Sequence, residues 1–353
     1  MSEITVHTNA NRTGLFDGSN LSMGEIMGGL INDTPEASAW VDRAITEHSN
    51  DRALGKIRSA VLWTDTPGPD GEPVGCADPS DLIEEINTDG LPMFRGHDPG
   101  FPVGRVVAAK LFTSPVGVRF VAAILNLYED RNLLSFDSLK IDPTPTVSSP
   151  SVLDALNDDC WLNFATDPRE VDTQWIDDVL SDAPLRVERT ELSHNAAEAQ
   201  GELIRITLVY AALVWNPFVT AIATEAGKDV YAGIQQWLHR LWNKLRERRN
   251  PIVVLQACQD GCEISFLFRG KDVKKLYDAH AGLPIAAAQA AKLIVSMKSK
   301  LAVPASLVYE FEQSHWFPSY AILTDGQIVS DRNLLIGIEQ LPTGLSIGIQ
   351  KQK

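Results

Sequence analysis

Residues 91–120 read LPMFRGHDPGFPVGRVVAAKLFTSPVGVRF and decide the fold that we expect for the first part of the chain. A turn rich in glycine and proline, with His97 and Asp98 inside it, precedes an alternating apolar run. Residues 103–112 and 116–127 are expected to be antiparallel strands joined by a short turn. The stretch therefore predicts a β-hairpin that presents a polar pair at the mouth of a strand, a common way to build a site.

Further strands are expected around this hairpin, over residues 55–140. Residues 56–63 alternate as a strand, and residues 66–74 form a long turn full of proline, glycine and aspartate. Residues 133–141, LLSFDSLKI, are interpreted as a further strand on which positions 135 and 137 share one face. We therefore expect residues 1–141 to form a β-rich, barrel-like domain.

The rest of the chain divides at a stretch of proline and hydroxyl residues. Residues 142–151, DPTPTVSSPS, cannot form a regular element and are predicted to be a linker. Residues 152–250 are expected to form a helical connecting region that ends in a long amphipathic helix. Residues 251–353 are expected to form an α+β domain of unknown role. The fold class predicted for the whole chain is α+β.

An uncharged stretch at residues 206–224 raises the question of a membrane span. We prefer a buried strand followed by a helix from about residue 217, because Asn216 and Pro217 match a helix start. The end of that helix carries tryptophans on one face and basic residues, among them Arg248, on the other. The preferred interpretation is a packed helix with a solvated basic face. The alternative is a surface for an anionic membrane or an acidic partner.

The bulk properties fit a globular chain of 353 residues with 44% hydrophobic residues and a formal net charge of −15. Such an acidic surface repels nucleic-acid backbones, so we expect no nucleic-acid partner. The N-terminal segment has neither a basic nor an apolar signal region, which favours a cytoplasmic location. The four cysteines are too sparse for a disulfide framework. Cys258 and Cys262 are interpreted as flanking a hairpin turn, so neither a metal nor a cofactor is expected.

The hairpin mouth could support nucleophilic catalysis. A serine becomes a nucleophile when a base lies within hydrogen-bond reach, and histidine is the usual base because its pKa is near neutrality. His97 is the candidate base, because the surrounding glycines and proline indicate an exposed turn. Ser135 and Ser138 are the candidate nucleophiles. They point to opposite faces of the expected strand, so only one of them can face His97.

The same residues carry a family resemblance. GHDPGFPVGRVVAAKLF, followed by GVRFVAAILN, resembles the tailed-phage prohead (capsid maturation) proteases, whose fold is similar to herpesvirus assemblin. The family's pattern of His-Asp, then Pro-hydrophobic-Gly-Arg, is matched from His97 to Arg105. The resemblance covers about residues 55–141 and favours Ser135, in NLLSFDSL, as the nucleophile. It implies a protein or peptide substrate and a homo-oligomer.

Other parts of the implied site stay open. The third catalytic residue could be Glu129, Asp130 or Asp137, and Arg105 and Asp98 are expected to support the oxyanion or the base. The family's glycine-rich serine ending is replaced at residues 135–138 by Ser-Phe-Asp-Ser. A second segment, GLSIG at residues 344–348, mimics the family's serine strand. Because it lies far from His97 along the chain, we interpret it as a coincidental strand.

Three functions are compatible with this sequence. The preferred one is a serine endopeptidase, by analogy acting in bacterial phage defence or in phage-related processing. The second is a non-catalytic binding or sensor protein built on a protease-like domain. The third is an effector that contacts membranes through residues 206–249, which is the least favoured of the three.

Overall fold

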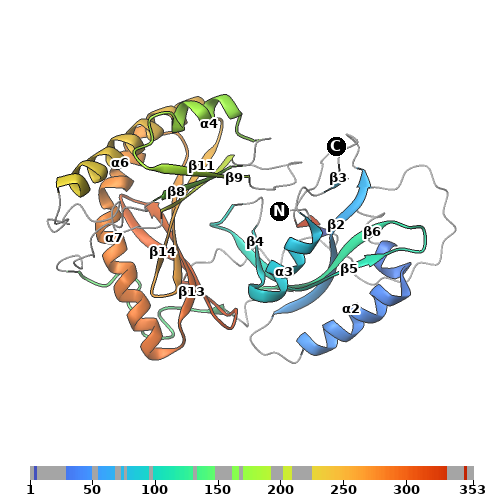
Figure 1. The fold of residues 1–353 in the computed structure, drawn as a ribbon. Coiled ribbons are helices and arrows are strands. Elements are labelled where there is room, and N and C mark those ends of the chain that lie inside the picture. The colour runs from blue at the N-terminus through green and yellow to red at the C-terminus, as the bar shows by residue number, and fades with distance from the viewer. Residues whose placement is uncertain are drawn as a thin grey trace. The chain divides into compact units, whose positions relative to one another are not determined.

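The computed structural model of the chain divides into two compact units, and each is described by itself (Figure 1). Unit 1 comprises Met1–Asn132, Ser193–Ala199 and Asn333–Lys353, and unit 2 comprises Leu133–Leu192 and Gln200–Arg332. The structure describes residues 4–5, 29–49, 55–67, 73–74, 78–94, 98–129, 133–147, 161–166, 170–191, 202–208, 225–331 and 346–347.

Unit 1 is built on a five-stranded antiparallel sheet with the strand order β3-β2-β6-β5-β4. The predicted hairpin is present: β5 and β6 are antiparallel partners, joined by a turn in which Ser114 N–H donates to Val118 O. The strands are β2 (Lys56–Pro67), β3 (Pro73–Val74), β4 (Leu91–Phe94), β5 (Pro102–Thr113) and β6 (Arg119–Leu127).

Two helices cover opposite faces of this sheet. α2 (Pro35–His48) packs through Val41 on the face that carries Phe120 and Ile124. α3 (Pro79–Asp89), capped by the Asp78 carboxylate on Ser80 N–H, packs through Ile86 on the other face. The central strand β6 is therefore buried on both faces and reads as a continuous apolar run.

This arrangement differs from the expected barrel-like domain. The described strands run in a linear order, with β3 at one end and β4 at the other. The physical reason lies in β6, whose FVAAIL run is apolar on both faces and is covered by a helix on each side. A separate two-stranded antiparallel pairing in unit 1 joins β1 (Ile4–Thr5) to β16 (Ser346–Ile347).

Unit 2 contains a nine-stranded mixed sheet with the order β7-β15-β14-β13-β12-β11-β10-β8-β9. Three of its parallel strand pairs, β8/β9, β10/β11 and β12/β13, are each connected through a helix, which is the usual connection between parallel strands. β7 and β15 are also parallel neighbours. The strands are β7 (Leu133–Leu134), β8 (Trp161–Thr166), β9 (Arg186–Glu191), β10 (Glu202–Leu208), β11 (Pro251–Gln259), β12 (Cys262–Arg269), β13 (Pro304–Glu312), β14 (His315–Leu323) and β15 (Ile328–Val329).

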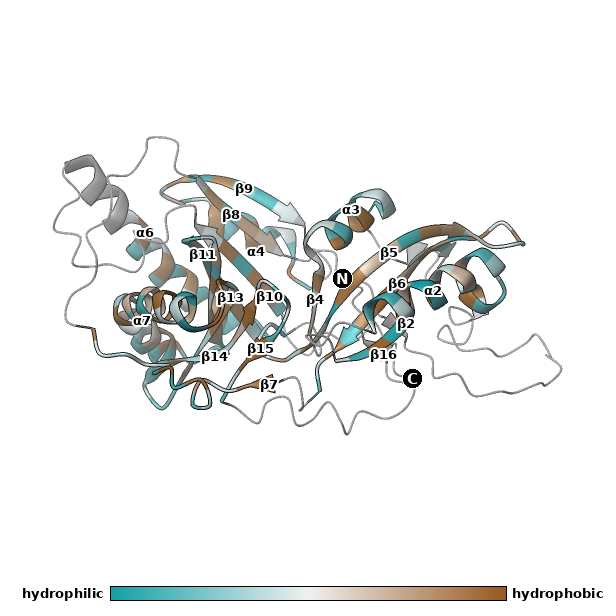
Figure 2. Ribbon diagram, turned by 90° about the horizontal axis from the view of Figure 1, so that it is seen from below, coloured by the Kyte–Doolittle hydropathy of each residue, from teal (hydrophilic) through white to brown (hydrophobic). Residues whose placement is uncertain are grey.

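The helices of unit 2 share one core with one face of this sheet (Figure 1). They are α4 (Thr173–Leu180), α6 (Glu225–Lys244), followed by the 3-10 turn Leu245–Glu247, and α7 (Val273–Lys300). Strands such as β10 and β13 are mostly hydrophobic, whereas α7 alternates hydrophobic and hydrophilic residues (Figure 2). Pro284 lies buried inside the continuous α7.

The α+β class is therefore confirmed, but the predicted division of the chain is not the observed one. Residues 152–250, expected to be a helical connection, contribute β8, β9 and β10 to the same sheet as residues 251–329. Residues 142–147 of the expected linker belong to unit 2. Helical residues could not be told from strands here, because apolar runs shorter than about 8 residues fit both periods.

The uncharged stretch at residues 206–224 is described only up to residue 208, where it belongs to β10. Within the described part of the chain, no helix has both the length and the apolar character that a membrane span requires.

Candidate functional site

The mouth of the hairpin is held by a short, well-bonded turn. His97 itself, with residues 95 and 96, lies outside the described residues. The positions that bracket it, Phe94 and Pro102, are partners across β4 and β5. Asp98 closes the turn: its Oδ1 accepts Gly100 N–H at 2.9 Å and its backbone oxygen accepts Phe101 N–H at 3.0 Å. Asp98 thus acts as a turn former beside the candidate base.

Arg105 lies near the start of β5, opposite Asn126 of β6 and Pro92 of β4. Its guanidinium lies against Gly90, where a β-carbon would come within 2.5 Å of Nη2. Gly90 has a φ of 72° and ends α3, so glycine is required there both for the backbone and for the space. A cation at this position also complements the C-terminus of α3.

Two buried polar side chains, Asn126 in β6 and Tyr128 just after it, lie near this arginine. Asn126 Oδ1 accepts Gly55 N–H at 2.6 Å, while its Nδ2 has no partner among the described residues. Burial raises the pKa of Tyr128 to about 12, and Arg105 opposes the shift. The Tyr128 hydroxyl also has no partner in the described part of the chain, and its backbone N–H donates to Val103 O. Glu129, a candidate third catalytic residue, follows directly and is half-buried.

Ser135 falls in unit 2, not in the unit that contains residues 78–129. The expected strand stops at β7, and residues 136–140 form a helical turn in which Ile141 N–H donates to Phe136 O at 2.9 Å. Ser135 Oγ accepts Ser138 N–H at 2.9 Å, and Ser138 Oγ donates back to Ser135 O at 2.8 Å. The prediction that positions 135 and 137 share a strand face is therefore wrong.

Asp137, another candidate third residue, is exposed on the same turn. Its N–H donates to the Asp331 carboxylate at 3.2 Å, which ties the first and last described segments of unit 2 together. Its bonding is that of a turn residue. Asp130, the remaining alternative, lies outside the described residues.

Ser346, in contrast, belongs to unit 1. It lies on β16 opposite Thr5 of β1, and the next pair is Ile347 with Ile4. The segment around it is the GLSIG that we interpreted as coincidental because of its distance along the sequence. Unit 2 makes up most of that distance, because Leu133–Leu192 and Gln200–Arg332 lie between β6 and β16 along the chain.

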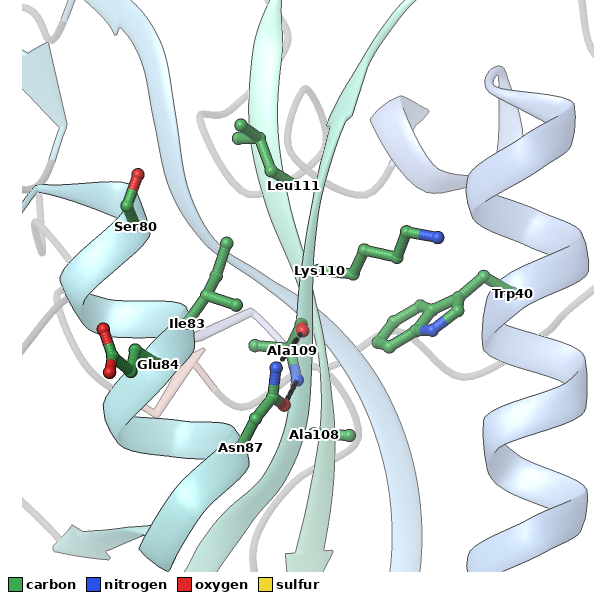
Figure 3. Close-up of a pocket in the computed structure, with 9 residues that line it drawn as sticks. All are labelled: Trp40, Ser80, Ile83, Glu84, Asn87, Ala108, Ala109, Lys110 and Leu111. Carbon is green, nitrogen blue, oxygen red and sulfur yellow. Dashed lines mark hydrogen bonds between the residues drawn. The ribbon is translucent and has the colours of Figure 1, made fainter.

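A second feature of unit 1 is an open pocket of about 630 Å³ along β5, which we call the edge groove (Figure 3). α3 forms one wall and α2 the other, with β5 between them. It is lined by Trp40, Ser80, Ile83, Glu84, Asn87 and the β5 residues 108–111. Sequence reasoning missed it, because no motif marks the unpaired side of a strand.

The basic face at the end of α6 is largely neutralised within unit 2. Arg240 pairs with Asp182 at 2.9 Å and Lys244 with Asp178 at 3.5 Å. These contacts support the interpretation of a packed helix over that of a surface for an anionic membrane.

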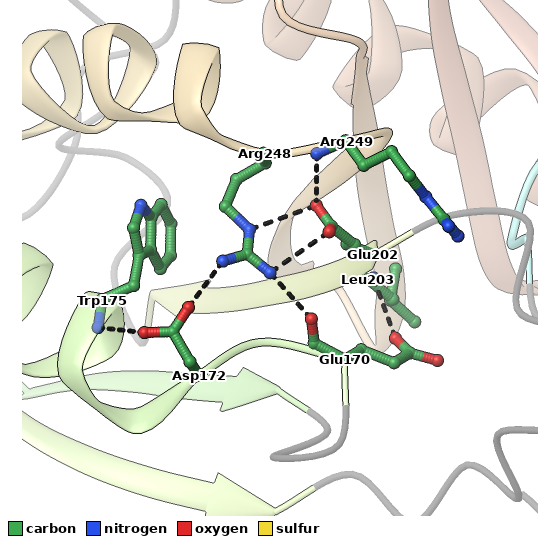
Figure 4. Close-up of polar contacts among 7 residues, drawn as sticks. All are labelled: Glu170, Asp172, Trp175, Glu202, Leu203, Arg248 and Arg249. Atoms are coloured by element: carbon green, nitrogen blue, oxygen red, sulfur yellow. Dashed lines mark hydrogen bonds and ion pairs between the residues drawn. The ribbon is translucent and has the colours of Figure 1, made fainter.

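Arg248 lies at the centre of a second group of polar contacts in unit 2 (Figure 4). It binds Asp172 at 2.8 Å, both carboxylate oxygens of Glu202 at 3.2 Å and the backbone oxygen of Glu170 at 2.7 Å. Its guanidinium also lies 5.3 Å from the Trp175 ring. The cluster joins α4, β10 and the end of α6, which is a structural role.

The two cysteines expected at a hairpin turn are there. Cys262 pairs with Gln259 and Cys258 with Glu263 across β11 and β12, and Asp260 and Gly261 make the turn. Burial raises the pKa of the Cys262 thiol to about 12, so it stays protonated. Among the described residues, no group of three or more His, Cys, Asp or Glu side chains is arranged to hold a metal ion.

Comparisons with protein-family models, with curated proteins and with solved structures found no match to this chain. The resemblance to the prohead proteases therefore stays a prediction that rests on the residues quoted above.

Proposed function

We propose that the chain is a serine endopeptidase of the prohead-protease type, with unit 1 as its catalytic part and unit 2 as a domain inserted into it. His97 is the general base and Ser346 the nucleophile, in place of the Ser135 that the sequence first favoured. The single observation that carries the proposal is the pairing of β16 with β1, which gives unit 1 a serine strand of the family's GLSIG type.

The assignment of Ser346 also accounts for two departures from the family pattern. Residues 135–138 lack the glycine-rich serine ending, whereas residues 344–348 have it. Few residues separate β6 from Ser135, and Ser135 is occupied in a turn of its own. A nucleophilic hydroxyl also needs a base within hydrogen-bond reach, and the contact described for Ser135 Oγ is the Ser138 N–H, a donor and not a base.

The reaction would follow the usual course of acyl transfer. Ser346 Oγ attacks the scissile carbonyl carbon while His97 takes the hydroxyl proton. His97 then gives this proton to the leaving amine as the peptide C–N bond breaks. Water, deprotonated by His97, next attacks the acyl carbon, and the ester C–O bond breaks as His97 returns the proton to Ser346 Oγ, which releases the acid product and restores the enzyme. Glu129 and Asp130 stay candidates for the third residue that orients His97, because both belong to unit 1, whereas Asp137 does not.

The substrate is a protein or peptide, in a phage-related or phage-defence setting. A cytoplasmic location and a homo-oligomeric state belong to the same proposal. No cofactor is required by this chemistry, because the serine and the base supply the nucleophile and the proton transfer.

Labelling with a fluorophosphonate probe, with the adduct located by mass spectrometry, tests the proposal. We expect an adduct on Ser346 that is lost in Ser346→Ala and His97→Ala and kept in Ser135→Ala, with Ser346→Ala and His97→Ala melting like the wild type. An adduct on Ser135 would restore the first assignment. A protein that folds but never reacts would instead favour the second candidate, a non-catalytic binding or sensor protein. The departure of residues 135–138 from the family's glycine-rich serine ending is the observation that favours it.

A further inference from the structure

Part of β5, beyond Val106, has no neighbouring strand on its β4 side among the described residues. β4 pairs with β5 only between Pro102 and Val106, and β6 occupies the other side along the whole strand. Beyond Val106, none of the described strands pairs with β5 on the β4 side. This is the side along which the edge groove runs (Figure 3).

Asn87 shows which backbone groups point into the groove. Its Oδ1 accepts Ala109 N–H at 2.9 Å and its Nδ2 donates to Ala109 O at 3.0 Å. These are the two bonds that a residue of an added strand would make. Backbone directions alternate along a strand, so the N–H and C=O of Leu111 also point into the groove, where they have no partner among the described residues.

The two walls of the groove differ in chemistry. Ile83 lines the α3 side, and Leu111 packs on that side too, which favours an apolar side chain there. Glu84, also on α3, disfavours an acidic one. On the α2 side, the exposed Lys110 extends toward Trp40 and over the Phe112 ring, at 5.5 Å (Figure 3). A carboxylate facing Lys110 would be the complementary charge.

We propose that the edge groove docks an extended segment of a partner protein, which adds to β5 as a further strand and alternates acidic and apolar side chains. Its backbone bonds the N–H and C=O of Leu111. Its acidic residues face Lys110 and its apolar residues face Ile83. Main-chain bonds give such an added strand its affinity, and the alternating pockets give it selectivity. This site is separate from the proposed catalytic residues, and its test needs no catalysis.

The test is fluorescence anisotropy with four labelled, end-blocked peptides: one alternating Glu and Val, one alternating Lys and Val, and two Glu/Val peptides N-methylated on alternate amides, one in each register. We expect the wild type to bind the Glu/Val peptide about tenfold or more tightly than the Lys/Val peptide. At least one of the two N-methylated peptides should not bind, because its methylated amides can no longer donate a hydrogen bond to Leu111 C=O.

The variant Lys110→Glu should reverse the preference between the two charged peptides. Lys56→Glu is the matched control, because Lys56 is an equally exposed lysine on β2, away from the groove, and its preference should stay that of the wild type. Leu111→Pro should lose all binding because it removes the outward N–H, and its melt should fall because Leu111 also packs against the core of unit 1.

Three results would overturn the proposal. One is a wild type that binds none of the peptides. Another is equal binding of the Glu/Val peptide before and after N-methylation in both registers. The third is a wild-type dimer that Leu111→Pro converts to a monomer in sedimentation, since the occupant would then be a second copy of this chain.

Discussion

Leu133 and Ile328 are neighbours across the parallel pair β7–β15, at one edge of the nine-stranded sheet. Ser330 N–H continues the contact to Leu134 O at 2.8 Å. Unit 2 therefore begins and ends at the same place, which is the condition under which a domain can be inserted into another without separating the flanking segments. This contact explains how β6 and β16 can belong to the same unit, although unit 2 lies between them in the sequence.

Unit 2 should fold when it is produced alone as residues 133–331. It has its own buried core, and its ends are already paired with each other. We expect a cooperative thermal melt and a near-native circular dichroism spectrum. A fragment that is unfolded, or that melts without cooperativity, would mean that unit 2 depends on the rest of the chain and is not an inserted domain.

Ser135→Ala should be a mild stability variant. It removes the acceptor of Ser138 N–H in an exposed turn, which should cost about 1 kcal/mol of unfolding free energy. Fluorophosphonate labelling should not change. Ser138→Ala is the control, since it removes the reciprocal bond to Ser135 O and should cost about as much. A loss of labelling in Ser135→Ala alone would return Ser135 to the catalytic role.

The part of the fold that was best predicted from the sequence is the pair of strands β5 and β6. Their alternation and the turn between them were predictable, because each is a local pattern. Local patterns do not identify the nucleophile in the same way. The segment GLSIG at residues 344–348 was interpreted as coincidental because it lies far from His97 along the chain, and the linear sequence gives no sign that Leu133 and Ile328 meet. Residues 136–140 were expected to extend a strand. Their helical turn depends on burying Phe136 and Ile141 in the core of unit 2, a tertiary contact that a short alternating run does not encode.

Asn87→Ala should free the backbone N–H and C=O of Ala109 on the unpaired side of β5. Both bonds to Ala109 are lost, but Asn87 is exposed and water can replace it, so the cost should be about 1 kcal/mol. Hydrogen exchange of the Ala109 amide should become faster. The Glu/Val peptide should bind more tightly, since Ala109 then becomes available to an added strand. Weaker peptide binding would show that Asn87 is itself part of the docking surface.

Arg248→Met should destabilise unit 2 strongly. Arg248 and Glu202 expose only 11% and 15% of their side chains, so removing the cation leaves a nearly buried carboxylate unpaired. A loss of about 3 kcal/mol in unfolding free energy is expected from denaturant melts. Arg240→Met is the matched control. Its pair with Asp182 is about half exposed, at 49% and 51%, and should cost less than about 1 kcal/mol. Equal losses in the two variants would contradict the structural role of the Arg248 cluster.

His280 should make unit 2 sensitive to acid. Its Nδ1 accepts the Trp242 indole N–H at 3.3 Å between α6 and α7, and the ring is 4% exposed. Burial, with a smaller contribution from His239, lowers the pKa of His280 to about 4. An unfolded histidine titrates near 6.5, so on acidification the unfolded chain takes up the proton first. The contribution of His280 to stability is therefore complete above about pH 6.5 and is lost as the pH falls toward 4, by about 3 kcal/mol in all.

Denaturant melts of the wild type and His280→Gln between pH 7 and pH 4 measure this contribution. Glutamine can still accept the Trp242 N–H but does not titrate, so the stability of the variant should fall less steeply with acid than that of the wild type. His315→Gln is the control, because His315 is exposed and its removal should leave the wild-type slope. Parallel pH profiles for the wild type and His280→Gln would show that His280 is not held neutral between α6 and α7, and would place the acid sensitivity of unit 2 elsewhere.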